Sequence, residues 1–159
     1  MRNEIKEIKL GYGLGVLKFG MSRAEVKLLL GEPSFIDAFS YSESSKDLTE
    51  SWEYENLKIS LGFDEEEQWK LTMISVASNF YQLEGKSLIG LQESELLNQL
   101  TDLNFEDIDV EDCSESDEED HRVIEIEEKS INFWLTNGVL DEIQWSPFFI
   151  DDDTIKWPE

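Results

Sequence analysis

The sequence predicts an α+β fold made of two similar units, each a helical segment followed by about four antiparallel strands, with the helices packed on one face of the sheet. Three observations predict it. An amphipathic helix is specified within residues 18–33, apolar and polar residues alternate in the segments that follow it, and the same order of apolar positions recurs about 70 residues later. The predicted boundaries are 1–80 for the first unit with its N-terminal segment, 81–150 for the second unit and 151–159 for an acidic tail.

The composition permits a folded core and favours one kind of partner. The chain has 159 residues, of which 40% are hydrophobic, and its formal net charge is −24, so it can bury a core despite its acidity. The charge is uneven, because residues 81–159 hold 23 acidic and 4 basic side chains, a net charge of −19. Such a field repels phosphate. We therefore expect no nucleic acid and no membrane as partner, and a basic protein instead.

Cysteine usage and the N-terminal sequence indicate a compartment. Cys113 is the only cysteine of the chain, which rules out an intramolecular disulfide. The sequence MRNEIKEIKL mixes Lys and Glu and lacks the apolar core of a signal peptide, and no apolar run has the length of a membrane span. We therefore expect a soluble cytoplasmic protein.

Residues 4–19 lead into the first helix through glycines at positions 11, 13 and 15. Their spacing lacks the third glycine of a dinucleotide-binding fingerprint, and no Gly-Lys-Ser/Thr of a P-loop is present. We expect these glycines only to shape a loop and a strand.

The first helix has its start, its buried face and its end written in the sequence. Ser22 and Glu25 stand three apart, as in a capping box. The apolar stripe at positions i, i+3 and i+4 consists of Val26, Leu29 and Leu30. Gly31 supplies the left-handed residue that ends the helix, and Pro33 prevents its continuation. The result is a helix of about ten residues.

After Pro33 the apolar pattern changes from a helical period to alternation. We predict strands at 35–41, 51–55, 57–63 and 71–77, separated by a polar loop at 42–50 and an acidic turn at 64–68. Short connections between alternating strands are typical of an antiparallel sheet.

The same order of positions then recurs. Ile89-Gly90-Leu91 repeats Phe19-Gly20-Met21 at an offset of 70, with Gln92 in place of Ser22. Further matches are Glu95 with Glu25, Leu96 with Val26, Leu100 with Leu30, Phe105 with Phe35, Ile124 and Ile126 with Trp52 and Tyr54, Ile131 with Ile59, and Ile143 with Ile74. Because the offsets change only at turns, the pattern indicates a tandem duplication.

The stretch GLGVLKFGMSRAEVKLLLGEP resembles the Gly-Met-Ser/Thr-x-x-x-Val-x-x-x-Leu-Gly-x-Pro signature that opens each unit of the β-lactamase inhibitory protein-like family. The resemblance implies two units whose sheets lie side by side and form a concave protein-binding surface. The chain departs from the inhibitor in having no disulfides and no export signal. The resemblance extends to cytoplasmic relatives of this fold, which include small acidic proteins of the kind found as immunity partners of bacterial toxins. The resemblance therefore implies a protein-binding inhibitor rather than an enzyme.

Alternation also predicts which side chains face away from the core in the second unit. If Ile131, Phe133 and Leu135 point inward, Trp134 points outward, where the first unit has Gly62. The same argument places Val123, Asn132, Glu125, Glu127, Glu142 and Gln144 outside. An exposed Trp framed by carboxylates is a candidate binding anchor. We predict a partner-binding face of Trp134, Glu125, Glu127, Glu142 and Gln144. The alternative is that the tail or the acidic loop covers Trp134.

The segment from Asp102 to Asp120 carries eleven acidic residues in nineteen. Asp107, Asp109 and Glu111 have the oxygen ligands of a calcium loop, but Asp112 stands where such a loop requires Gly. We expect a solvated or disordered loop and no bound metal.

No nucleophile or general base stands out. The acidic neighbours of Cys113 should raise the pKa of its thiol, and His121 has no second His or Cys for zinc. Ser44, Ser45 and Ser130 lie in no nucleophile motif. We expect no catalytic residue, cofactor or metal.

Three functional hypotheses follow. In the first, the acidic second unit docks onto a basic surface, such as the active site of a toxin. In the second, Glu125 and Glu142 perform acid–base chemistry or hold a divalent metal. In the third, the carboxylates imitate the phosphates of DNA. An open acidic face with an aromatic favours the first, whereas an enclosed pair of carboxylates favours the second.

Overall fold

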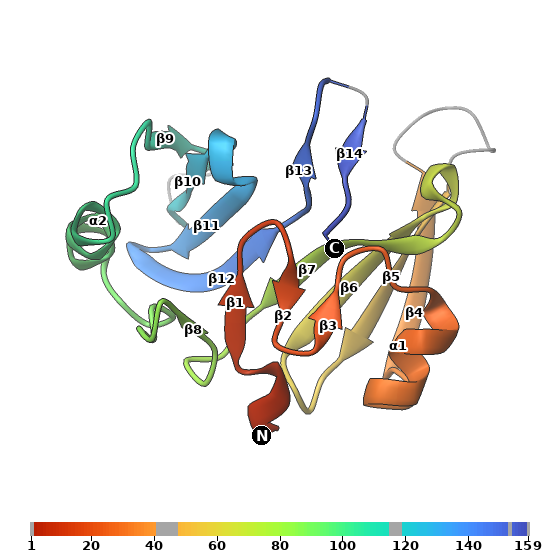
Figure 1. The fold of residues 1–159 in the computed structure, drawn as a ribbon. Helices are drawn as coiled ribbons and strands as arrows, with labels where there is room; N and C mark the ends of the chain where they lie inside the picture. Colours follow the sequence, from red (N-terminus) through yellow and green to blue (C-terminus); the bar gives the residue numbers. More distant parts are fainter. Residues whose placement is uncertain (1, 41–47, 115–118, 153, 159) are drawn as a thin grey trace.

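The chain is mostly β structure in a computed structural model that describes residues 2–40, 48–114, 119–152 and 154–158 (Figure 1). Of these residues 19% are helical and 45% are in strands or bridges. The α-helices are α1 (Arg23–Leu30) and α2 (Glu93–Asp102), and the 3₁₀ turns are η1 (Asn3–Ile5), η2 (Glu65–Glu67) and η3 (Glu127–Lys129). The strands are β1 (Glu7–Lys9), β2 (Gly13–Leu14), β3 (Leu17–Lys18), β4 (Phe35–Ser40), β5 (Leu48–Tyr54), β6 (Ile59–Asp64), β7 (Lys70–Val76), β8 (Gln82–Leu83), β9 (Asp109–Asp112), β10 (His121–Ile126), β11 (Ile131–Thr136), β12 (Val139–Trp145), β13 (Phe148–Phe149) and β14 (Ile155–Lys156).

Eight strands form one antiparallel sheet in the order β4-β5-β6-β7-β12-β11-β10-β9. A smaller sheet has the order β3-β2-β1-β8, and β13 pairs with β14 as a hairpin. Figure 1 shows α1 and the smaller sheet against the large sheet, with α2 towards its β9 end. The layers are joined by polar contacts, because the buried Trp145 indole Nε1 donates to the Gly13 carbonyl at 3.0 Å and the Tyr54 hydroxyl donates to the Gly31 carbonyl at 2.9 Å.

The predicted α+β class, a tandem of helix and about four strands, is wrong. The strands of both segments belong to one sheet, because β7 pairs with β12 through Ile74 and Trp145. The helices are also too short to cover that sheet. α1 fully buries only Val26, and α2 only Leu96 and Leu100. The N-terminal segment adds to the core through η1 and the strands β1 to β3, whose buried residues include Ile5, Ile8, Leu14 and Leu17.

Several individual elements are nevertheless confirmed. In α1 the Ser22 hydroxyl accepts from the Glu25 backbone N–H at 3.1 Å, and the Glu25 carboxylate accepts from the Ser22 N–H at 3.1 Å. Gly31 ends the helix at φ +83°. β4 to β7 occupy the predicted strands and η2 the predicted acidic turn. Of the predicted polar loop, residues 42–47 lie outside the described residues, and Leu48 already begins β5. The boundaries at 80 and 150 stay a prediction.

Three segments contain more strands than the sequence pattern indicated. The glycine-rich lead-in was expected to form a loop and a strand, and it contains β1, β2 and β3. Gly13 and Gly15 are required there, because a Cβ would lie 2.0 Å from a backbone carbonyl oxygen at each position. The acidic segment 102–120 was expected to be a loop, yet β9 within it pairs with β10. The predicted tail contains β14, and Trp157 lies against Gly20.

The longest helix in the described ranges, α2, has ten residues. Within those ranges no helix combines the length and the apolar character needed to cross a membrane.

Candidate protein-binding surface

The large sheet has one face against the core, and alternate residues point to the other face, called here the open face. The strand register aligns a row of polar side chains across six neighbouring strands of this face: Glu125, Asn132, Gln144, Ser75, Ser60 and Glu53. Of these only Ser75 is buried, at 5% exposure, and the others are partly exposed. The open face is therefore a polar surface that runs from β10 to β5.

The structure brings the predicted binding residues together on this face. The inward positions are confirmed, since Ile124, Ile126, Ile131, Phe133, Leu135, Ile143 and Trp145 are each at most 1% exposed. Trp134 lies opposite Glu142 in the register and donates its indole N–H to the Gln144 Oε1 at 3.0 Å. Its ring is partly exposed. Glu127 follows β10 in η3 and is exposed.

One predicted outward residue is buried instead. Val123 is only 1% exposed although it lies on the open face. The register explains this, because Val123 stands between Trp134 on β11 and Glu111 on β9. The expected loop had offered no such neighbour on the β9 side. The neighbour of Trp134 on β10 is therefore a buried apolar side chain.

The position of the first segment (β4–β7) that matches Trp134 in the sequence is Gly62 and carries no side chain. Gly62 also lies on the open face, but the Met73 side chain occupies the space beside it, since a Cβ on Gly62 would lie 3.1 Å from the Met73 Cβ. The first segment thus has no side chain at the position of Trp134, and the exposed aromatics of its open face are Phe35 and Phe39 on the edge strand β4.

The carboxylates of the open face fall into two kinds. Glu142 accepts a hydrogen bond from the Ser75 hydroxyl at 2.6 Å, and Glu53 accepts from the Ser60 hydroxyl at 2.6 Å. These two are part of the structure of the face. Glu125 differs, because its register partner on β9 is Asp109, a like charge, and no described side chain donates to it. Like charges directly opposite each other cost stability.

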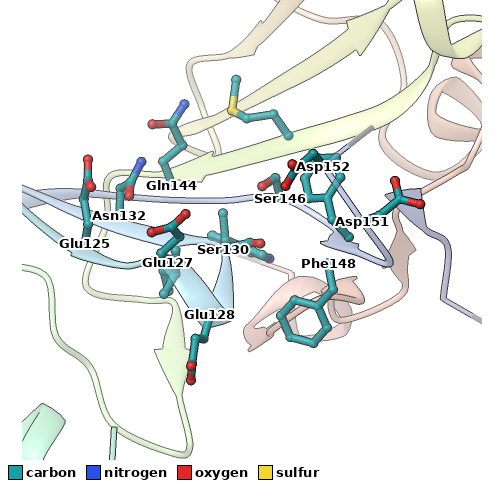
Figure 2. Close-up of a pocket in the computed structure, with 14 residues that line it drawn as sticks. Glu125, Glu127, Glu128, Ser130, Asn132, Gln144, Ser146, Phe148, Asp151 and Asp152 are labelled. Carbon is teal, nitrogen blue, oxygen red and sulfur yellow. The ribbon is translucent and has the colours of Figure 1, made fainter. Parts of the chain in front are cut away.

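A cleft of about 830 Å³ lies where the open face meets the β13–β14 hairpin (Figure 2). Its carboxylates are Glu125 from β10, Glu127 and Glu128 from η3, and Asp151 and Asp152 from the hairpin turn. Phe148 and Phe149 supply apolar surface, and Asn132 and Gln144 form part of the sheet side. No Lys, Arg or His is among the described residues that line it.

The hairpin side of this cleft was missed at the sequence level. The segment FFIDDDTIK has two apolar stretches around a polar turn, which is a hairpin signal. The duplicated pattern ends before this segment and therefore predicts a tail there instead of a hairpin. The hydrogen bond from Ser75 to Glu142 could not be predicted, because strand alternation places a serine on the outer face without showing which side chain lies next to it.

The candidates for catalysis do not assemble. Glu125 and Glu142 lie on strands separated by β11, so their backbones are on the order of 10 Å apart. The His121 Nε2 lies 3.3 Å from the Glu119 Oε1 at the start of β10. Partial burial, together with Glu111, Asp112 and Glu125, raises the pKa of the Cys113 thiol, as predicted in direction. Within the described ranges, no three His, Cys, Asp or Glu side chains are grouped to hold a metal ion.

Comparisons of the chain with protein-family models, with curated proteins and with solved structures found no match. The β-lactamase inhibitory protein-like family therefore stays a hypothesis that depends on the motif at residues 20–33.

Proposed function

We propose that this chain is a non-enzymatic protein-binding module, an acidic inhibitor or immunity-type protein that docks on a basic partner. The docking face consists of Trp134, Glu125, Glu127, Glu142 and Gln144. A toxin whose active site binds phosphate would offer a suitable basic surface, because carboxylates can occupy the place of phosphates. The proposal assigns the protein to the cytoplasm, which the single cysteine supports.

The observation that carries the proposal is the arrangement around Trp134. Trp134 is partly exposed on the open face, donates a hydrogen bond to Gln144 and lies directly opposite the carboxylate residue Glu142. A Trp that is already held loses little conformational freedom on binding. Fixed aromatic side chains of this kind supply most of the energy at many interfaces.

The charge of the chain supports the same conclusion. Residues 81–159 carry a net charge of −19. Three residues of the polar row on the open face, Glu125, Asn132 and Gln144, belong to this half of the chain. A field of this size attracts a basic partner over long range and accelerates association, most strongly at low ionic strength.

The alternative of carboxylate or metal chemistry has less support. Glu142 is engaged by Ser75, and Glu125 is on the far side of β11 from it. Acid–base pairs and metal sites need groups that converge on one reacting atom or ion. An open face with separated carboxylates suits recognition of a broad basic surface.

Affinity capture with a matched variant tests the proposal. Columns of the wild type, of Trp134→Ala and of Trp69→Ala are loaded with the same bacterial lysate, and a protein retained by the wild type is purified and titrated. Trp69 is a partly buried Trp that lies outside the proposed face. The Arg23 guanidinium stacks on its ring, with the Cζ atom 4.5 Å from the ring centre. We expect Trp134→Ala to weaken binding by about 2 kcal/mol, which is roughly 30-fold, and Trp69→Ala to have little effect.

Circular dichroism and thermal unfolding serve as controls for the fold of both variants. If folded Trp134→Ala binds like the wild type, or if it does not fold because Trp134 belongs to the core, the proposed face is wrong.

A further inference from the structure

The β13–β14 hairpin has an unusual apolar tip. Phe149 is 53% exposed and Ile150 is 69% exposed, beside the acidic turn. The turn is closed by backbone hydrogen bonds, with the Ile150 N–H donating to the Thr154 carbonyl at 2.8 Å. Figure 1 shows the hairpin projecting from the body of the molecule. Adjacent exposed apolar side chains at a projecting tip are typical of an interaction site.

The base of the hairpin is fixed to the body. The Phe148 ring occupies the space above Gly11, where a Cβ would lie 2.4 Å from ring carbons. Trp157, just after β14, lies against Gly20, and the Lys70 Nζ stands 5.2 Å from the centre of its ring. The tip is therefore exposed on a hairpin that is packed at both strands.

The hairpin and the sheet enclose the cleft from two sides. Figure 2 shows Glu125 and Glu127 on the sheet side and Asp151 and Asp152 on the hairpin side. Because the described lining has carboxylates and no basic side chain, a cation that enters the cleft is attracted from both sides. Charge complementarity thus selects a basic group, and the apolar tip selects an apolar neighbour next to it.

We propose that the cleft receives an arginine side chain on a loop of the basic partner, and that apolar residues flanking this arginine pack on Phe149 and Ile150. This inference rests on the proposed function and names the element of the partner that the surface recognises. Arginine fits better than lysine, since its planar guanidinium pairs with several carboxylate oxygens and stacks on an aromatic ring. The partner thus meets two neighbouring sites, Trp134 on the sheet and the cleft beside it.

The probe is Nα-acetyl-arginine methylamide, titrated into the isotope-labelled full chain and followed by NMR. We expect the largest shifts at the side-chain amides of Asn132 and Gln144, with saturation in the millimolar range. The citrulline analogue has the same shape without the charge, and should shift these signals less than one fifth as much. The lysine analogue should bind at least twofold more weakly than arginine.

Two variants with the same loss of charge locate the effect. Glu127→Gln with Glu128→Gln removes two charges from η3 in the cleft, and Glu65→Gln with Glu66→Gln removes two from η2, which does not line it. We expect the first pair to weaken arginine binding at least fivefold and the second by less than 1.5-fold. If the two pairs weaken arginine binding equally, or if NMR shifts appear on all acidic surfaces, the probe responds only to the net negative charge of the protein, and the proposal is wrong. An equal response to citrulline would overturn it as well.

Failure here can be separated from failure of the proposed function. With a captured partner, Phe149→Ser with Ile150→Ser should weaken binding at least fivefold through the tip. If this pair has no effect while Trp134→Ala still lowers affinity, the cleft proposal is wrong and the proposed function stands. If neither change affects binding, both are wrong.

Discussion

Replacing Glu125 by Gln should stabilise the free protein, because this carboxylate does not support the fold. It lies directly opposite Asp109 across β9 and β10, and no described group donates a hydrogen bond to it. Gln keeps the size and polarity of the side chain and removes only the charge. A residue retained for a partner, at a cost to stability, should behave in this way.

The size of the gain follows from the register. Directly opposed side chains on neighbouring strands lie about 6 Å apart, where two unit charges in water repel by about 0.7 kcal/mol. At physiological ionic strength the repulsion falls to about 0.3 kcal/mol, because the Debye length is then about 8 Å. We expect Glu125→Gln to raise the free energy of unfolding by about 0.5 kcal/mol at low salt and by about half of that at 0.15 M.

Urea unfolding at two salt concentrations measures this gain. Asp109→Asn completes a double-mutant cycle, in which Glu125→Gln should gain less once Asp109 is neutral. Glu142→Gln is the matched control, since it removes the same charge but weakens the bond from Ser75, and should be neutral or destabilising by up to about 1 kcal/mol. Destabilisation by Glu125→Gln would refute the reasoning, because the carboxylate would then hold the fold together.

Three further predictions concern the fold and its ionisable groups. Trp145→Phe removes the buried indole donor of the Gly13 carbonyl, and denaturant titration should show a loss of about 1–3 kcal/mol; a smaller loss would mean that water replaces the bond. Burial and the nearby Glu32 carboxylate raise the pKa of Tyr54 from 10.0 to about 12. The neutral hydroxyl therefore contributes fully to the free energy of unfolding below pH 10, and this contribution is lost as the pH rises towards 12. Between pH 9 and 12 the midpoint of urea unfolding should fall less steeply in Tyr54→Phe than in the wild type. The raised pKa of Cys113 predicts slower alkylation by iodoacetamide at pH 8 than for N-acetylcysteine methylamide, an uncharged reference thiol, and equal or faster alkylation would contradict it.

Local signals predicted the elements of the chain better than the sequence predicted their assembly. The capping box at Ser22 and the glycine at position 31 act within one helix, so their residues suffice to identify it. Alternation likewise identified the buried side of β11. The fold class failed at a different level, because the sequence does not state that β7 meets β12, which is a contact between residues about 70 positions apart.

The candidate site was predictable to the same extent. Trp134, Gln144 and Glu142 share one face because a strand alternates strictly, and this follows from the sequence. The burial of Val123 depends on β9, an acidic strand whose composition is typical of a loop. The cleft depends on where a distant hairpin packs, and its anchor at Gly11 has no local signal.

The most direct test of the account is the association rate with the captured partner at several salt concentrations. Wild type is compared with Glu125→Gln plus Glu142→Gln, and with Glu65→Gln plus Glu66→Gln as a control of equal charge. We expect the first pair to slow association several-fold at low salt, the control to have a smaller effect, and the three rates to converge near 0.5 M salt, where charges on the surface are screened. If the two pairs slow association equally, or if neither changes it, the open face around Trp134 is not where the partner docks.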